Sequence, residues 1–233
     1  MALPGERERP RPAKSLLPEV VRRLRSAYPY DRLGNKADPL DELVYIVLST
    51  RTRGAVFGRT FDKLKKRYPT WEAVSRARRS SIERLLEPAG LSKKKARWLL
   101  EILSEIKKRE GRATLARLER MSDREAEQYL IGLPGVGQKT ARCVLMYSLR
   151  RAVFPVDANS RRLLERLGVL SSALTYYEVH DAAQQIVPKS IREPLHIYAI
   201  IHGRSRCLPR KPRCDGCVLE DVCEFARSAP NTA

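Results

Sequence analysis

The sequence has no long hydrophobic run, almost no alternating strand pattern and far fewer acidic than basic residues. The longest apolar runs, such as VYIVL at 44–48, are too short to cross a bilayer, so no membrane segment is expected. The N-terminal stretch MALPGERERPRPAK is charged and rich in proline and has no apolar core. We therefore expect residues 1–14 to form a disordered basic tail rather than a secretory signal.

The shortage of acidic residues is the strongest signal in the composition. There are 46 lysines and arginines against 27 aspartates and glutamates, which gives a formal net charge of +19. An excess of this size favours a polyanionic partner, and nucleic acid is the commonest one, although charge does not separate RNA from DNA. In a prokaryote such a protein is expected in the cytoplasm, in association with the nucleoid.

Helical patterns follow one another along the chain in place of strands. Asp38-Pro39 is typical of a helix start, with aspartate as N-cap and proline in the first turn. The S-x-x-E pattern of a capping box begins at Ser80 and again at Ser122. The sequence therefore predicts an all-α protein of roughly ten short helices. Further helices are expected at 15–28, 92–110, 123–131, 138–149, 158–167, 175–186 and 191–202, and residues 227–233 are expected to form a C-terminal tail.

Cysteine is concentrated near the end of the chain. Four thiols with the spacing C-x6-C-x2-C-x5-C suit a metal centre better than disulfides, and the spacing leaves both zinc and an iron–sulfur cluster open. These residues are Cys207, Cys214, Cys217 and Cys223. The fifth, Cys143, falls inside a helical pattern, so we expect a small core side chain there.

The segment LPGVGQKTA, which begins at Leu133, lies between two predicted helices and indicates a helix–hairpin–helix. Glycines at 135 and 137 let the backbone turn tightly and approach another surface, and the free N–H groups of the second helix favour an anion. A phosphate of a DNA backbone fits this description, so Leu133, Gly135, Val136 and Gly137 are candidate DNA-binding residues. An ordinary glycine turn between helices is the alternative.

Two residues near the hairpin are candidates for catalysis. Lys139 is either a further phosphate contact or, if partly desolvated beside the bound backbone, a nucleophile. Asp157, eighteen residues later in VDANSRRL, is either a catalytic carboxylate or the N-cap of the helix that follows. A DNA-binding module without catalytic activity would explain the charge and the hairpin but not this pair.

LPGVGQKTA, VDANSRRL and IIHGRSRCLPRKPRCDGCVLEDVCE together resemble the endonuclease III family of helix–hairpin–helix DNA glycosylases, from about residue 16 to 226. The resemblance implies two helical domains with a DNA-binding cleft between them. One domain is a six-helix barrel at about 36–150. The other, formed by 15–35 and 151–226, holds a 4Fe–4S cluster on the four cysteines. The resemblance thus favours iron–sulfur over zinc.

By the same resemblance, Lys139 matches the catalytic lysine and Asp157 the catalytic aspartate. The expected protein is a monomeric, bifunctional DNA glycosylase and abasic-site lyase. Its substrate is double-stranded DNA that carries a damaged pyrimidine or an abasic site. The damaged nucleotide is flipped out, the Lys139 amine attacks C1′, and β-elimination from the Schiff base nicks the strand.

Two further matches concern contacts with DNA. Leu91 corresponds to a leucine that wedges into the gap left by the flipped base, with a buried helix-start leucine as the alternative. Arg210, Lys211 and Arg213 lie in the loop between Cys207 and Cys214, where the family contacts phosphates. An exposed basic loop without a role is the alternative for these three.

The sequence departs from the family in the segments expected near the base. In VLSTRTRG, Arg51 stands where the family has a glutamine that fills the helix at the lesion, and Gly54 stands where it has an aspartate. Asn159 replaces a histidine after the catalytic aspartate and is a candidate substrate-pocket residue. VDAN resembles segments of thymine-mismatch and plant 5-methylcytosine glycosylases. A glycosylase for T·G or U·G mismatches or for modified cytosine is therefore the alternative function.

Overall fold

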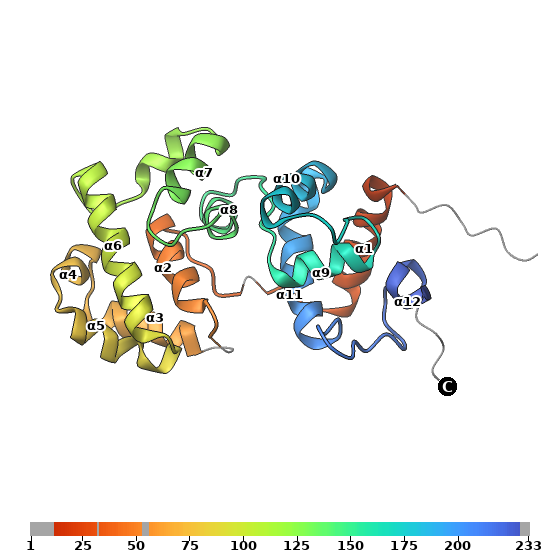
Figure 1. Cartoon of the computed structure of the whole chain (residues 1–233), viewed down its shortest axis with the longest axis horizontal. Coiled ribbons are helices and arrows are strands. Elements are labelled where there is room, and N and C mark those ends of the chain that lie inside the picture. Colours follow the sequence, from red (N-terminus) through yellow and green to blue (C-terminus); the bar gives the residue numbers. More distant parts are fainter. Residues whose placement is uncertain (1–11, 32, 53–55, 229–233) are drawn as a thin grey trace, which may run out of the picture. The chain divides into compact units, whose positions relative to one another are not determined.

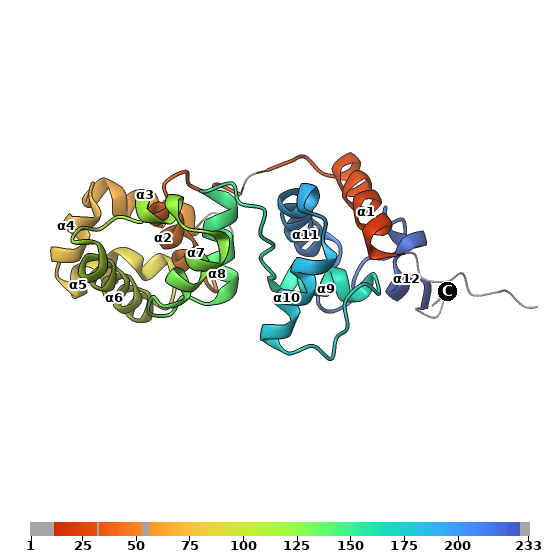
Figure 2. The same ribbon diagram turned by 90° about the horizontal axis from the view of Figure 1, so that it is seen from above.

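The computed structural model describes residues 12–31, 33–52 and 56–228, and these residues form helices and connecting segments without a strand. The predicted all-α fold class is confirmed. The chain divides into two compact units (Figures 1 and 2). One comprises Arg32–Pro155, and the other comprises Met1–Asp31 together with Val156–Ala233.

The unit at Arg32–Pro155 is built around one largely buried helix. This helix is α2, which begins at Pro39, and the Asp38 carboxylate caps it by accepting hydrogen bonds from the amides of Leu40 and Asp41 at 2.9 and 2.8 Å. α3 and α8 pack against α2, and α5 packs against α6. The α-helices of this unit are α2 (Pro39–Ser49), α3 (Val56–Arg67), α4 (Trp71–Arg76), α5 (Arg79–Leu86), α6 (Ser92–Glu110), α7 (Asp123–Ile131) and α8 (Gln138–Tyr147), with short 3-10 turns η1 (Glu87–Ala89) and η2 (Ala116–Arg120).

One of the two predicted capping boxes is correct. At the start of α7, the Ser122 amide donates to the Glu125 carboxylate at 2.9 Å and the Glu125 amide donates back to the Ser122 hydroxyl at 3.3 Å. The box predicted at Ser80 is wrong, because α5 already begins at Arg79 and no side chain caps it. Glu83 instead accepts a hydrogen bond from Arg79 Nε at 2.7 Å, one helical turn earlier.

The second unit joins the start of the chain to its end. α1 packs against α11, so helices far apart in sequence lie side by side (Figures 1 and 2). Leu17, Val20 and Leu24 of α1 are fully buried. The elements of this unit are α1 (Ala13–Ala27), α9 (Ala158–Arg166), α10 (Tyr176–Ile186), α11 (Arg192–Ser205) and α12 (Glu224–Ser228), with the 3-10 turns η3 (Lys189–Ile191) and η4 (Glu220–Val222).

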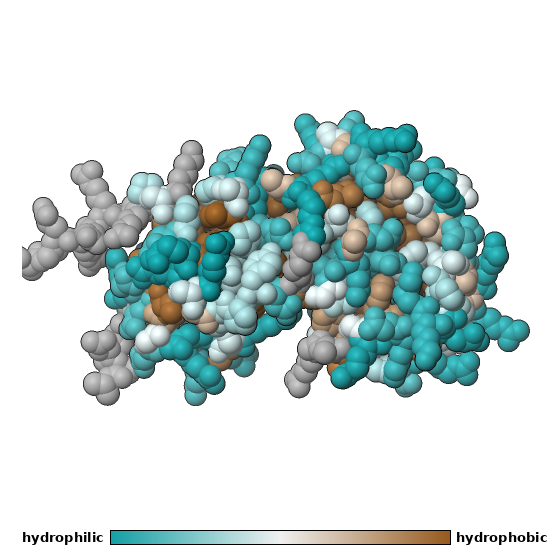
Figure 3. Space-filling model, turned by 180° about the vertical axis from the view of Figure 1, so that it is seen from behind, coloured by the Kyte–Doolittle hydropathy of each residue, from teal (hydrophilic) through white to brown (hydrophobic). Residues whose placement is uncertain are grey.

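Four residues that were assigned to the two predicted tails are helical instead. α1 already begins at Ala13 and α12 continues to Ser228, so residues 13–14 and 227–228 are helical. The remaining tail residues, 1–11 and 229–233, lie outside the described residues. Polar side chains cover most of the face in Figure 3. Within the described residues, no helix is both long enough and apolar enough to cross a membrane.

Candidate functional site

The glycine hairpin connects α7 to α8. Leu133 and Val136 are buried and anchor the turn, whereas Gly135 and Gly137 are exposed. Gly135 has a φ of +73°, and a Cβ atom there would lie 3.0 Å from Cδ1 of Trp98 on α6, so both its conformation and its surroundings favour glycine. No side chain caps the first turn of α8. Its N–H groups therefore suit an anion.

Lys139 is the second residue of α8, and its side chain is half-buried. It interacts electrostatically with Glu42 of α2, which is fully buried and whose carboxylate accepts a hydrogen bond from the Lys36 amide at 2.6 Å. Burial raises the pKa of Glu42 to about 7, while the Lys36 amide and the charges of Lys139 and Lys36 oppose that shift. A titratable carboxyl group thus lies within the electrostatic reach of Lys139.

Asp157 is the N-cap of α9, as one of its two interpretations predicted. Its Oδ1 accepts hydrogen bonds from the amides of Asn159 at 2.9 Å and Ser160 at 2.8 Å, and its Oδ2 accepts one from the Asn159 side-chain amide at 3.1 Å. The carboxylate is therefore held in one orientation. Asp157 and Lys139 belong to different compact units of the chain.

Both the nitrogen and the oxygen of the Asn159 side-chain amide form hydrogen bonds. Its oxygen accepts a hydrogen bond from Arg162 at 2.9 Å, and Arg162 also donates to the carbonyls of Gly203 at 3.1 Å and Cys207 at 2.9 Å. A Cβ atom at position 203 would lie 2.6 Å from Asn159 Oδ1, so the packing requires glycine there. Asn159 thus links Asp157 to the start of the cysteine segment.

The four predicted metal ligands line one cavity, together with Arg166, His202 and Arg206. Arg166 donates a hydrogen bond to the sulfur of Cys207 at 3.0 Å and to the carbonyl of Leu208 at 2.9 Å. Burial raises the pKa of the Cys214, Cys217 and Cys223 thiols. Among the residues that the structure describes, no three His, Cys, Asp or Glu side chains are grouped closely enough for a metal ion. The lining of this cavity combines four cysteine thiols with two arginines, which is the chemistry that a negatively charged thiolate-bound centre requires.

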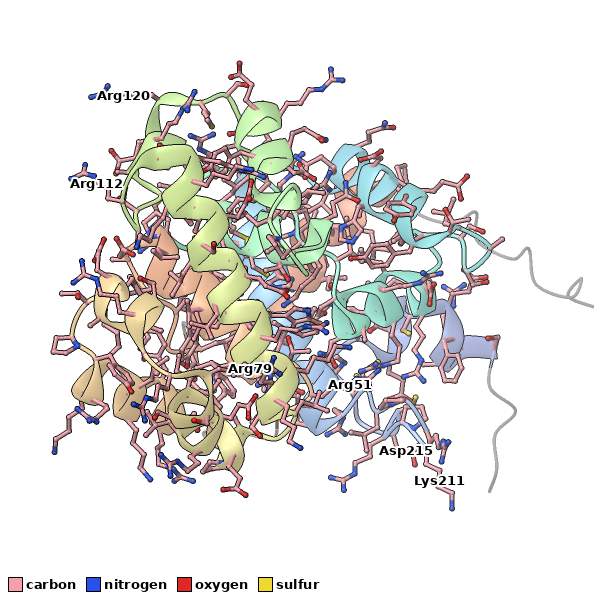
Figure 4. The ribbon with its side chains drawn as sticks, turned by 60° about the vertical axis from the view of Figure 1, so that its left-hand side comes forward. Arg51, Arg79, Arg112, Arg120, Lys211 and Asp215 are labelled. Carbon is pink, nitrogen blue, oxygen red and sulfur yellow. The ribbon has the colours of Figure 1, made fainter. Side chains whose placement is uncertain are left out.

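The predicted phosphate-binding residues Arg210, Lys211 and Arg213 are all exposed on the loop between Cys207 and Cys214. The Lys211 side chain extends away from the ribbon (Figure 4). Lys211 also has a φ of +50°, which lies in the left-handed region of the backbone map. The loop therefore presents three cations to solvent beside the cysteine cavity.

Arg51 and Leu91, both in the unit at Arg32–Pro155, share a left-handed backbone conformation. Arg51, labelled in Figure 4, follows the C-terminal end of α2, is exposed and has a φ of +53°. Leu91 precedes α6, has a φ of +52° and is 45% exposed, so the alternative of a buried helix-start leucine is wrong. Gly54, the other predicted departure in this segment, lies outside the described residues. Cys143 is buried in the core, as predicted.

Sequence analysis did not identify Glu42 or Lys95, both of which are fully buried. Glu42 and its neighbour Asp41 both directly precede the apolar stretch LVYIVL, so the sequence does not show which of the two is buried. Lys95 looks like one of three consecutive lysines, two of which are not buried, so the sequence contains no signal that distinguishes it.

The fold and the hairpin define a class of protein. Residues 44–189 match the family model described as "HhH-GPD superfamily base excision DNA repair protein", and the chain is accordingly a DNA glycosylase with DNA as its partner. Within that superfamily, the chain belongs to the endonuclease III family.

The relatives include proteins with two different names. Endonuclease III of Thermotoga maritima is 29% identical over 91% of this chain and 94% of its own length. Thymine-DNA glycosylase of Aeropyrum pernix is 30% identical over 82% of this chain and 84% of its own.

Solved structures show the same fold. A trapped endonuclease III–DNA covalent intermediate superimposes with a TM-score of 0.79 at 23% identity, covering 91% of this chain and 96% of that one. A thermostable thymine-DNA glycosylase superimposes with a TM-score of 0.78 at 22% identity, covering 93% and 97%.

Proposed function

We propose that the chain is a bifunctional DNA glycosylase and abasic-site lyase that removes damaged pyrimidines. The observation that supports it most directly is Lys139, half-buried in the first turn of α8 immediately after the hairpin. A phosphate bound at the first turn of α8 brings the sugar–phosphate backbone close to this amine. Glu42, with its pKa near 7, is suited to accept a proton while Lys139 becomes neutral and nucleophilic.

In this mechanism, the neutral amine of Lys139 attacks C1′ of the flipped nucleotide. The C1′–base bond breaks, and the base leaves with the bonding electrons and is protonated. The C1′–O4′ bond of the sugar ring then breaks, O4′ takes up a proton, and the bond between C1′ and the Lys139 nitrogen becomes a Schiff base. A proton is then lost from C2′, and the bond between C3′ and its phosphate oxygen breaks, which nicks the strand. Positive charge that develops on the sugar is stabilised by the Asp157 carboxylate.

We further propose that Cys207, Cys214, Cys217 and Cys223 hold a 4Fe–4S cluster. Four cysteine sulfurs around one cavity match the ligand set of such a cluster, and Arg166, which donates to Cys207 Sγ, offsets its negative charge. Bound to these four cysteines, the cluster would hold in place the segment that carries Arg210, Lys211 and Arg213. Those three side chains are then positioned to neutralise phosphates.

A mismatch glycosylase is the second candidate function. The Aeropyrum pernix relative is named thymine-DNA glycosylase, and it is 30% identical to this chain. Arg51 supplies a charged donor that suits guanine O6 and N7, the acceptors of the base opposite a mismatched thymine or uracil. This function uses the same Lys139 and Asp157 and differs only in the base that is accepted.

A panel of duplexes tests the proposal and separates the two candidates. Wild-type protein is incubated with duplexes that contain thymine glycol, dihydrouracil, T·G, U·G or a plain abasic site, with and without borohydride. Nicking and covalent trapping on the abasic duplex support the lyase step, because borohydride reduces a Schiff base to a stable bond. If base removal occurs without trapping, the protein is a monofunctional glycosylase instead.

Replacing Cys217 with alanine is expected to remove the cluster. Wild-type protein should be yellow-brown and contain about four irons per chain, and Cys217→Ala should lose the colour and most of the iron. Its C-terminal segment should also unfold at lower temperature. Cys143→Ala is the matched control, because Cys143 is buried in α8 in the other unit, and this variant should keep its iron. A colourless wild-type protein with one zinc per chain contradicts the assignment.

Replacing Arg51 with glutamine is expected to change substrate preference rather than overall activity. A neutral amide is shorter than a guanidinium and does not carry its charge, so the variant should shift toward oxidised pyrimidines by about tenfold relative to T·G. Its rate on the abasic duplex should change less than about threefold. Rates on all five duplexes measure the effect. If the rate falls by a similar factor on every duplex, Arg51 binds a phosphate and does not select the base.

A further inference from the structure

The ammonium group of Lys95, in the first turn of α6, is fully buried. Its nitrogen lies 2.8 Å from the Leu48 carbonyl, 2.8 Å from the Ala89 carbonyl and 2.6 Å from the Thr52 hydroxyl. Three N–H donors thus meet three oxygen acceptors. Among the described residues, no carboxylate lies within ion-pair distance of Lys95, so neutral oxygens alone stabilise its charge.

These contacts connect two segments that are distant in sequence. Leu48 and Thr52 flank Arg51, whereas Ala89 precedes Leu91 by two residues. The Thr52 hydroxyl also lies 2.6 Å from the Ala89 carbonyl, which adds a second link between the segments. Burial lowers the pKa of Lys95 to about 8, so keeping this charge has a cost that a methionine of similar shape would avoid. The contacts that it makes explain why a charged group occupies this position.

Both segments contain a non-glycine residue in the left-handed region. Arg51 has a φ of +53° and Leu91 a φ of +52°, and both side chains are exposed. Such conformations are strained and persist only where the surrounding structure fixes them. Lys95 supplies that constraint, since its acceptors flank Arg51 on both sides and lie just before Leu91. Without those hydrogen bonds, either residue can relax into a more common conformation and turn its side chain elsewhere.

We propose that Lys95 is a positioning residue that holds Arg51 and Leu91 in one arrangement toward the DNA and thereby sets how readily a nucleotide is extruded. The proposal rests on the proposed function, in which Leu91 fills the gap left by the flipped base and Arg51 meets the base opposite. Lys95 touches neither the DNA nor the reacting atoms, and it acts through these two residues.

Hydrogen exchange of the free protein tests the constraint without any need for catalysis. Lys95→Met keeps the length of the side chain and removes its donors, so amides at 48–52 and 89–92 should exchange at least about tenfold faster than in wild type, with the other helices unchanged. Thr52→Val removes one acceptor of Lys95 and should show the same pattern more weakly, whereas Thr52→Ser should resemble wild type. Unchanged exchange in both segments overturns the proposal. If Lys95→Met does not fold, the two Thr52 variants carry the test.

Unstacking of the base opposite the extruded nucleotide is measured with 2-aminopurine, which fluoresces more when it is unstacked. The probe is placed opposite a stable abasic analogue in a duplex, and Thr52→Val and Lys95→Met should reduce the fluorescence rise that wild type produces. A double-mutant cycle then tests whether Lys95 affects base removal through Leu91. Lys95→Met should slow base removal by about tenfold in the wild-type background but less than about twofold in a Leu91→Ala background.

Additive losses in this cycle, or unchanged fluorescence, overturn the proposal. Failure of the proposed function is recognised separately, because it appears as absence of nicking and trapping by the wild-type protein on the abasic duplex. The exchange and fluorescence measurements do not depend on that step.

Discussion

Replacing Lys139 with glutamine should abolish borohydride trapping and strand nicking. The amide of glutamine cannot attack C1′ or form a Schiff base, so nicking of an abasic duplex should fall by at least about 10³-fold. Binding to the same duplex should change by only a few-fold, because the hairpin and the first turn of α8 remain. The fold should tolerate the change, since the buried Glu42 can take up a proton when the nearby positive charge is lost.

Gel separation of trapped complexes and of nicked strands measures the two losses. Lys63→Gln is the matched control, because Lys63 is an exposed lysine on α3 in the same unit, and this variant should trap as wild type does. Trapping that survives in Lys139→Gln would place the nucleophile on another amine and would overturn the assignment of Lys139.

Replacing Asp157 with asparagine should slow base removal by about 10²–10³-fold, because the charge that stabilises the developing positive sugar is lost. The loss should not come from unfolding. Asparagine is as good an N-cap as aspartate, so the carbonyl oxygen can still accept from the amides of Asn159 and Ser160. The melting temperature should therefore change little.

Single-turnover rates on a lesion duplex, with melting curves of each variant, separate the two effects. Asp38→Asn is the matched control, since it makes the same change at the N-cap of α2. This control should lose neither stability nor base removal to any large extent. If Asp157→Asn loses its activity only in proportion to a drop in melting temperature, Asp157 is a structural cap and not a catalytic carboxylate.

The helices were predictable because their signals are local. Asp38-Pro39 and Ser122-x-x-Glu125 each form a cap within a few residues of chain, and the apolar spacing of α1 can be recognised without knowledge of its partner. The failure at Ser80 has an equally local cause. A serine inside the first turn of a helix and a serine at the N-cap can have the same S-x-x-E pattern. The backbone conformation of the preceding residues determines where the helix begins, and here it begins at Arg79, before Ser80.

The candidate site was predictable only in part. Cysteine spacing and the glycine hairpin are encoded in short segments, whereas the buried charges depend on contacts between helices. Burial raises the pKa of Glu42 to about 7, and that burial comes from packing between helices rather than from the residues next to it in sequence. Lys95 differs from the two lysines before it only in the direction that it faces, toward oxygens 6 and 47 residues away in the chain. Such distant pairings leave no pattern in a single sequence.

The close packing of Gly203 against Asn159 limits the mutations through which this protein can evolve. Since there is no room for a Cβ atom beside Asn159 Oδ1, even Gly203→Ala is blocked while Asn159 and its bond to Arg162 remain in place. A lineage can gain a larger residue at 203 only after, or together with, a change at 159. Asn159, which orients Asp157, and Gly203, which lies 44 positions later near the C-terminal end of α11, are therefore inherited as a pair. Selection that acts on residue 159 also constrains residue 203.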